Sequence, residues 1–303
     1  MRIGISIGTT YRAGNLRDGP RSVVAQARAA NRAGLDTLSV GDHHATGPMP
    51  YLQNVPMLGR LLAEWDDRPA GCLFLVPLWH PVLMAEQIGT LAVLARGPFV
   101  VQAGLGGNPA EVEAMGARLG ERGRRMEEGI TLVQALLRGE TVRSERWGIG
   151  DACIAPVPPS EVEWWVAGAA DAALDRAARL GDCWYGNADL TPTTAAVLID
   201  RYRAACARHG REPVRIPVRK DVFLAESKAE AERVGDDLMA AGYRGLEREA
   251  VAYGDPESVA EQLAVYAALG FTDIVVRTMS VPADAAVRSV ELAGEVRARL
   301  LGA

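Results

Sequence analysis

Short apolar runs alternate along the chain with longer stretches in which apolar residues recur every three or four positions. The short runs predict β-strands, and the longer stretches predict amphipathic α-helices with one buried face. The expected strands cover residues 3–7, 37–40, 70–76, 99–103, 164–167, 183–185, 216–225 and 273–276. The expected helices cover residues 21–34, 55–64, 82–95, 121–137, 170–180, 193–209 and 283–301, with one long helical segment at 228–269.

This strict succession of strand and helix predicts an α/β fold. Each helix returns the chain in the same sense, so the strands it joins are expected to be parallel. Eight such units favour closure into a (β/α)8 TIM barrel, and an open doubly wound sheet is the alternative. Such barrels are typically about 250 residues long. We therefore predict one domain over residues 1–303, with insertions after strand 4 and strand 7, the first an irregular excursion at 139–163 that could hold a short strand pair.

Composition excludes several classes of function. A net charge of -5 with basic residues dispersed among acids argues against a nucleic-acid-binding surface. No apolar run approaches the ~18–20 residues of a membrane span, and the N-terminus enters a strand-like run with no signal sequence, so we expect neither membrane insertion nor export. The four cysteines lack metal-ligand spacing. We expect them to be reduced thiols of a cytoplasmic protein without a metal site.

The second expected strand ends in Asp42-His43-His44. In parallel α/β barrels, catalytic side chains sit where strands end, because there the helix-covered core opens to solvent. His43 in such a place could exchange protons near neutral pH, with Asp42 fixing its tautomer or contacting a ligand directly. The alternative is that two surface histidines share a turn.

Small residues follow two further strands. The strand at 99–103 runs into Gly104-Leu105-Gly106-Gly107-Asn108, where a planar ligand or a phosphate can approach the backbone because no Cβ intervenes. A tight turn without a ligand explains the same residues, and the spacing is not that of a dinucleotide-binding fingerprint.

The strand at 164–167 flows into a helix through Gly168, Ala169 and Ala170, whose amide groups could bind an anion. Close packing of helix on strand is the alternative and is compatible with that use. Arg277 ends the last strand and could add a positive charge at the same rim, or it could simply be an exposed arginine.

Five segments together resemble one known family. They are 34–44 with its acid and two histidines, 80–97, 104–116 with its glycine-rich turn, 164–182, and 254–273. In this order and spacing they resemble the bacterial luciferase-like superfamily of flavin- and deazaflavin-dependent oxidoreductases. The resemblance extends over almost the whole chain.

The resemblance implies a barrel that binds coenzyme F420 or FMN at the C-terminal ends of its strands. It makes His43 the active-site histidine and Asp42 the preceding acid that contacts the cofactor. It also implies that the strand at 73–76 backs the cofactor ring, in which relatives often carry a non-proline cis peptide. The cofactor-binding residues implied are Leu73, Phe74, Gly104, Gly106, Gly107, Asn108, Ala167, Gly168, Ala169 and Ala170.

The chain departs from the family pattern at three places. Residues 95–99 read Ala-Arg-Gly-Pro-Phe where the family usually has serine and Gly-Arg, and the glycine turn lacks the arginine that luciferases place against the flavin phosphate. Pro109 stands near where some F420-dependent sugar dehydrogenases carry a catalytic glutamate. These departures favour F420 over FMN and argue against a sugar-phosphate dehydrogenase.

We therefore expect an oxidoreductase that transfers hydride to or from a small organic substrate. His43 would donate or accept a proton, and Asp42 would orient it. The loop at 46–56 would roof the pocket, with Tyr51, Gln53, Trp79 and Arg277 as candidate substrate contacts, although ordinary packing explains the aromatic residues equally well.

Two other functions fit the same residues. One is a monooxygenase that uses O2 and reduced FMN supplied by a partner reductase. The other is a protein that binds a flavin or F420 without turnover. The homodimers frequent among relatives are a further expectation for this chain.

Overall fold

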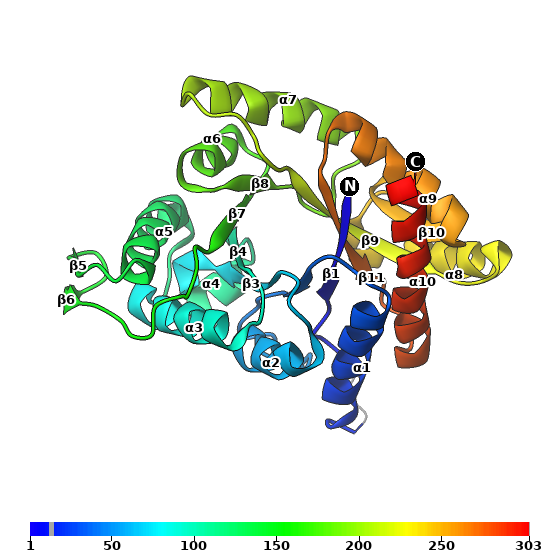
Figure 1. The fold of residues 1–303 in the computed structure, drawn as a ribbon, viewed down its shortest axis with the longest axis horizontal. Helices are drawn as coiled ribbons and strands as arrows, with labels where there is room; N and C mark the ends of the chain where they lie inside the picture. The colour runs from blue at the N-terminus through cyan, green and yellow to red at the C-terminus, as the bar shows by residue number, and fades with distance from the viewer. Residues whose placement is uncertain (12–14, 303) are drawn as a thin grey trace.

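The computed structural model describes residues 1–11 and 15–302, and its centre is one curled sheet of nine parallel strands surrounded by helices (Figure 1). The strands are β1 (Arg2–Ile7), β2 (Leu38–Val40), β3 (Ala70–Leu75), β4 (Phe99–Gly104), β7 (Glu163–Ala167), β8 (Cys183–Tyr185), β9 (Pro217–Leu224), β10 (Val251–Gly254) and β11 (Asp273–Thr278). Their order is β10-β9-β11-β1-β2-β3-β4-β7-β8. All eight predicted strands are present, which confirms the predicted α/β class.

The helices cover the outside of the sheet. They are α1 (Asp18–Arg32), α2 (Asn54–Leu61), α3 (Pro81–Leu94), α4 (Pro109–Ala114), α5 (Arg122–Leu137), α6 (Asp171–Leu180), α7 (Pro192–Arg208), α8 (Lys228–Ala240), α9 (Pro256–Leu269) and α10 (Ala283–Gly302). Helix α10 packs against both α1 and α9, so the last helix lies beside the first (Figure 1). The excursion at 139–163 contains an antiparallel pair, β5 (Val142–Ser144) and β6 (Ile149–Ala152).

The two sides of the curl meet between β8 and β9. The Gly186 amide donates to the carbonyl of Pro217 at 2.8 Å, and the Arg219 amide donates to the carbonyl of Gly186 at 3.0 Å. Inside the curl, side chains of β4, β7, β8 and β11 form one apolar cluster, which comprises Val100, Trp165, Cys183, Tyr185 and Val275. A larger apolar core lies between the strands and the helices. The strands are therefore buried on both faces, as their continuous apolar runs require.

The long helical segment predicted at 228–269 is wrong in its middle. Helix α8 ends at Ala240, and β10 follows and pairs in parallel with residues 221–224 of β9. All four residues of β10 are buried, so burial against β9 outweighs the local helical pattern. Asp255 then caps α9, because its carboxylate accepts the Ser258 amide at 2.8 Å.

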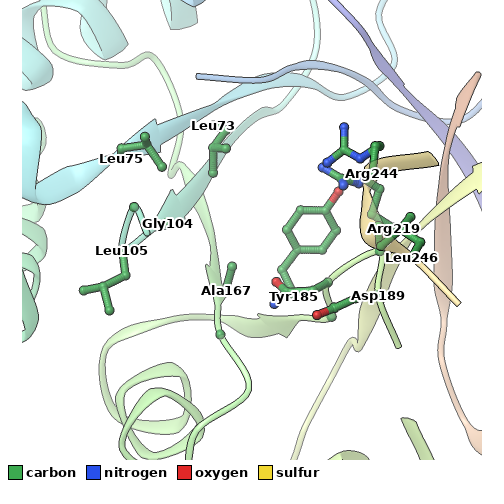
Figure 2. Close-up of a pocket in the computed structure, with 15 residues that line it drawn as sticks. Leu73, Leu75, Gly104, Leu105, Ala167, Tyr185, Asp189, Arg219, Arg244 and Leu246 are labelled. Atoms are coloured by element: carbon green, nitrogen blue, oxygen red, sulfur yellow. The ribbon is translucent and has the colours of Figure 1, made fainter. Parts of the chain in front are cut away.

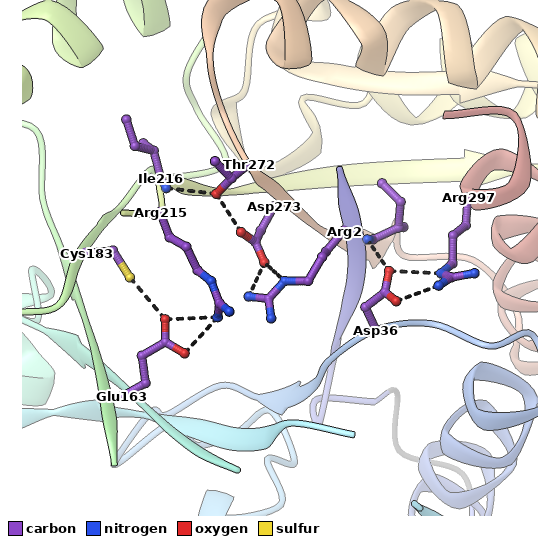
Figure 3. A network of polar contacts seen from close by, with 10 residues as sticks. Arg2, Asp36, Glu163, Cys183, Arg215, Ile216, Thr272, Asp273 and Arg297 are labelled. Carbon is purple, nitrogen blue, oxygen red and sulfur yellow. Dashed lines mark hydrogen bonds and ion pairs between the residues drawn. The ribbon is translucent and has the colours of Figure 1, made fainter. Parts of the chain in front are cut away.

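Ion pairs tie together the N-terminal ends of the strands (Figure 3). The pairs are Arg2–Asp273, Arg297–Asp36 and Arg215–Glu163. Asp36 also accepts the Ile3 amide at 2.7 Å, and Asp273 accepts the Thr272 hydroxyl at 2.6 Å. This end of the sheet therefore has its charges matched within the protein.

Substitution of Gly71 tests the close approach of β3 and β4. A Cβ on Gly71 would lie 1.8 Å from the carbonyl oxygen of Val100, a backbone atom that cannot rotate away. We expect Gly71→Ala to lower the free energy of unfolding by about 1–3 kcal/mol or more, measured by urea denaturation. Gly150→Ala is the matched control, because nothing lies within 4 Å of a Cβ there. Equal unfolding midpoints for the two variants would contradict this packing.

Candidate functional site

A cavity of about 420 Å³ opens at the C-terminal ends of the strands. Its lining follows β3, β4, β7 and β8 in turn and is completed by β9 and by the segment after α8. The lining residues are Leu73, Leu75, Gly104, Leu105, Gly106, Ala167, Gly168, Tyr185, Gly186, Asn187, Ala188, Asp189, Arg219, Arg244 and Leu246. This is the end of the sheet at which parallel α/β folds place their ligands.

The cavity has two walls of different character (Figure 2). Leu73, Leu75 and Leu105 form an apolar wall together with the backbone of the glycine turn. Arg219 and Arg244 lie on the other side, and Tyr185 stands between the two walls with its hydroxyl toward the arginines (Figure 2). An apolar planar group and a charged group can thus be accommodated at the same time.

Half of the predicted cofactor-binding residues line this cavity, namely Leu73, Gly104, Gly106, Ala167 and Gly168. Gly107, Asn108, Ala169 and Ala170 continue the same two turns beyond the lining. The side chain of Phe74 is fully buried in the core instead, with its ring centroid 5.1 Å from that of Trp79.

The cis peptide that the family resemblance implied for residues 73–76 is absent. Across residues 1–11 and 15–302, the cis bonds are Gly47–Pro48 and Ala155–Pro156. The chain leaves β3 through Leu75, at φ -77° and ψ 77°, and a 3₁₀ turn over Val76–Leu78.

Asp42 joins the end of β2 to the end of β3. Its carboxylate is fully buried and accepts the Leu75 amide and the Trp79 indole N–H, each at 2.8 Å. The other carboxylate oxygen lies 3.3 Å from Nε2 of His44. Residues 42–44, which follow β2, are called the histidine turn below. Because Leu75 lines the cavity, the contact between Asp42 and the Leu75 amide fixes the histidine turn against the cavity wall. The predicted pairing of Asp42 with His43 is therefore not present, because Asp42 faces His44 instead.

His43 faces a different carboxylate, that of Glu111 in the first turn of α4. Oε1 of Glu111 lies 3.4 Å from Nδ1 of His43 and accepts the His44 amide at 2.6 Å. Glu111 is almost fully buried, whereas the His43 side chain is 54% exposed. The ring of Tyr51 meets His43 edge-on at 5.5 Å between centroids. His43 is therefore oriented by Glu111 and Tyr51 and remains accessible.

His44 is the more enclosed of the two histidines. Burial alone would lower the pKa of His44, but the hydrogen bond and charge of Asp42, together with the charge of Glu111, raise it above its usual value of 6.5. The ring also meets Trp79 edge-on at 5.7 Å between centroids. His44 thus supports the turn that carries His43 from the side of Asp42 and Trp79.

The remaining predicted contacts lie around this turn. Gln53 donates its side-chain amide to the carbonyl of His43 at 3.1 Å. Burial raises the pKa of Tyr51 to about 12. A Cβ placed on Gly8 at the end of β1 would lie 3.2 Å from the guanidinium of Arg277, so Arg277 covers the end of that strand.

A buried lysine supports the cavity from behind. Lys220 of β9 donates its Nζ to the carbonyls of Ala188 and Leu190, at 3.2 and 2.7 Å, and so fixes the loop that lines the cavity after β8. Burial lowers the pKa of Lys220 to about 7. The sequence offered no sign of this support, because the lysine stands inside a strand.

Sequence reasoning also missed Glu111, Arg219 and Arg244 as site residues. Glu111 could have been suspected, because an acid in the first turn of a helix directly after a strand-end glycine turn lies near the strand ends. Arg219 and Arg244 are brought together by the pairing of β9 with β10. The strand β9 was predicted, but the residues of β10 lie inside the segment predicted as helical.

Two features are absent from residues 1–11 and 15–302, the part of the chain that the structure describes. None of their helices combines the length and the apolar character that crossing a bilayer requires. Nor do their His, Cys, Asp and Glu side chains group into a set of three or more suited to a metal ion.

Comparison with known proteins identifies similar sequences. A family model described as luciferase-like monooxygenase matches residues 1–250. An F420-dependent glucose-6-phosphate dehydrogenase of Beutenbergia cavernae is 32% identical over 188 residues, which is 57% of this chain and 54% of that protein. An FMNH(2)-dependent dimethylsulfone monooxygenase of Pseudomonas fluorescens is 27% identical over 187 residues, 60% of this chain and 51% of that protein. The chain thus spans about half the length of these curated relatives.

Solved structures match over the full chain at low identity. A monooxygenase from Streptomyces bottropensis superposes with a TM-score of 0.84 at 18% identity and 99% coverage of both chains. An F420-dependent secondary alcohol dehydrogenase superposes with a TM-score of 0.80 at 16% identity, covering 98% of this chain and 99% of that one. These similarities show a shared fold.

The protonation of His44 tests the Asp42 contact. In Asp42→Asn the amide oxygen can still accept the Leu75 N–H, but the negative charge beside His44 is lost. The lowering effect of burial on the pKa of His44 then exceeds the raising effect of the Glu111 charge. We therefore expect this pKa to fall from above 6.5 to below 6.5, measured by NMR titration of the imidazole. Glu111→Gln should lower it less, because Glu111 acts only through its charge. Identical titration midpoints in wild type and Asp42→Asn would contradict the assigned contact.

Proposed function

Because the chain belongs to the luciferase-like monooxygenase family, we propose that it is an oxidoreductase that binds coenzyme F420 or FMN. The cofactor would lie in the cavity, and hydride would pass to or from a small organic substrate. The observation that carries this proposal is the contact of Asp42 with the Leu75 amide, which joins the turn that carries the accessible His43 to the apolar, glycine-lined wall. His43 itself is not among the residues that line the cavity, and it faces Glu111 at the end of β2.

The cavity fits a flat, anionic cofactor. Leu73, Leu75 and the Gly104–Gly106 backbone offer an apolar surface without aromatic side chains, which suits one face of a planar ring. Gly168 adopts φ +140° directly before α6, and a Cβ there would lie 2.5 Å from the Cβ of Ala173. A glycine is required at this position, and the amides of Gly168, Ala169 and Ala170 would hold the cofactor phosphate at the start of that helix.

The proposal includes one closed domain. We infer that β1, β2, β3, β4, β7, β8, β9 and β11 form an eight-stranded barrel over residues 1–303, closed by the hydrogen bonds between Gly186 and β9. The β5–β6 pair is then the insertion after strand 4, and the segment from α8 to β10 is the insertion after strand 7.

The protein's own contribution is positioning and proton transfer. A bound F420 or FMN would supply hydride chemistry. The cavity walls would hold donor and acceptor carbon in contact, which can be worth up to ~7–11 kcal/mol of the barrier. The carboxylate of Glu111 lies 3.4 Å from Nδ1 of His43 and would hold the proton there, so that Nε2 would donate or accept the substrate proton, in place of the role first given to Asp42.

Local chemistry favours F420 over FMN. The turn from Gly104 to Asn108 contains no arginine for a flavin phosphate. The guanidinium of Arg122, which reaches this turn, is already bonded to the carbonyl of Gly106. The name of the Beutenbergia cavernae relative points the same way.

A monooxygenase that consumes O2 and reduced FMN is the second candidate, supported by the name of the Pseudomonas fluorescens relative. It would require a reductase partner, and O2 consumption with reduced FMN would distinguish it from anaerobic hydride transfer with F420. Homodimerisation stays a prediction.

Gly107 offers a test of where the cofactor lies. Nothing lies within 4 Å of a Cβ at Gly107 or at Gly120, and neither has a positive φ, so both should accept leucine without loss of stability. If the cofactor passes along the glycine turn, Gly107→Leu should weaken F420 binding at least tenfold, measured by fluorescence titration. Gly120→Leu should bind F420 as wild type does. Equal affinities would place the cofactor elsewhere.

His43→Ala tests the proton-transfer role. Turnover of any substrate accepted by wild type should fall by about 10²–10⁴, with F420 affinity unchanged. His209→Ala is the control, because His209 pairs with Asp175 outside the cavity. Unchanged turnover in His43→Ala would remove the assigned role, and tight cofactor binding by a wild type without turnover would favour a storage function.

A further inference from the structure

Two arginines that line the second wall of the cavity, Arg219 and Arg244, pair with one buried aspartate, and a third arginine stands opposite that aspartate on the neighbouring strand. Arg219 and Asp221 occupy alternate positions of β9 and so point to the same face of the sheet. Nε of Arg219 lies 3.4 Å from Oδ1 of Asp221, and Nε of Arg244 lies 3.4 Å from Oδ2. Arg277 of β11 is the direct register partner of Asp221.

The cluster carries more positive than negative charge. Arginine stays protonated in proteins, so three guanidinium groups face one carboxylate, which also accepts the Tyr243 hydroxyl at 2.9 Å. Asp221 lies behind the cavity lining, and the carboxylate within the lining, that of Asp189, is exposed at the rim. Burial and then the charges of Arg219 and Arg244 lower the pKa of Arg277, which shows that the three groups act on one another. Charges of like sign held close together repel one another, and a bound anion would relieve that repulsion.

Hydrogen-bonding capacity remains unused at the same place. Nε of Arg219, Oδ1 of Asp221 and the Tyr185 hydroxyl are buried and make no hydrogen bond to the described residues, although the first two face each other as an ion pair. Arg244 reaches the cavity from a backbone with φ +52°, a conformation that L-residues rarely adopt. The segment after α8 is thus bent in a way that delivers a guanidinium to this wall.

We propose that Arg219, Arg244 and Arg277 bind an oxyanion group of the substrate, such as a carboxylate, sulfonate or phosphate monoester. This inference rests on the proposed function, because it assigns the apolar wall to the cofactor and the arginine wall to the substrate. Arg277 lies near enough to Tyr51 for its charge to act on that hydroxyl, and Tyr51 contacts His43. A substrate anchored at the arginines would therefore extend toward the imidazole.

Calorimetric titration of the full-length protein with inorganic phosphate tests this site at constant ionic strength. Arg219→Gln, Arg244→Gln and Arg277→Gln should each weaken phosphate binding about tenfold or more, because each loses a charge-assisted contact. Arg244→Lys should lose less than Arg244→Gln, since it keeps the charge but not the planar fork. Arg233→Gln is the matched control, an exposed α8 arginine paired with Asp237, and should bind phosphate as wild type does. Circular dichroism confirms that each variant folds.

A second arm repeats the titration with saturating F420, and again with FMN. Phosphate affinity that is retained within about threefold supports an anion site for the substrate. Phosphate that is displaced by either cofactor assigns the arginines to the cofactor and overturns the inference. Equal phosphate binding by wild type and the three glutamine variants overturns it as well.

The two proposals fail separately. Phosphate bound at the arginines by a protein that binds neither F420 nor FMN would overturn the proposed function and retain the anion site. Cofactor binding without phosphate binding would retain the proposed function and overturn the anion site. For a substrate that is turned over, Arg244→Gln should raise KM while leaving kcat within about threefold, which a general structural defect would not do.

Discussion

The buried carboxylate of Asp42 is the contact on which the functional end of this protein depends. A buried charge without partners is costly, and Asp42 meets that cost by accepting the Leu75 amide and the Trp79 indole while facing His44. These contacts fasten the end of β2 to the end of β3. Asp42 thereby sets both the position of the histidine turn and the shape of the apolar cavity wall. Glu111 adds a second contact to the same turn from α4, by accepting the His44 amide.

Charge is arranged differently at the two ends of the sheet. At the N-terminal ends of the strands, acids and arginines are paired one to one, as in the contact of Arg2 with Asp273 (Figure 3). At the C-terminal ends, Arg219 and Arg244 share Asp221, Arg277 stands opposite it, and buried polar atoms of this cluster make no hydrogen bond. Matched charges contribute to holding the strands together, whereas unmatched charges create a preference for a ligand. Stability and binding are thus assigned to opposite ends of the same strands.

The sequence was sufficient to predict eight strands, because buried parallel strands are continuous apolar runs. It was also sufficient to predict the histidine turn and the two small-residue turns that follow strands. The sequence was insufficient for β10. Its four residues lie inside a helix-like pattern, and they form a strand only because they pair with β9. Partners such as Glu111 for His43 also escaped, since local pattern carries no information on which side chains meet across 68 positions. The proximity of Arg219 and Arg244 escaped for the same reason, because sheet register brings them together and their spacing in the sequence does not indicate it.

The two cavity walls differ in how strongly they depend on side-chain identity. The glycine turn and the start of α6 offer peptide groups, and many sequences can supply those provided that small residues let a ligand approach. The arginine wall is built from side chains of β9, β11 and the segment after α8. β10 is fixed to β9 by the pairing of Val251 with Asp221, and the arch between α8 and β10 contributes Arg244 and Leu246 to the cavity lining. A change in the length of that arch would move Arg244 without disturbing the strands, so this segment can alter which substrate is held while the cofactor wall stays the same.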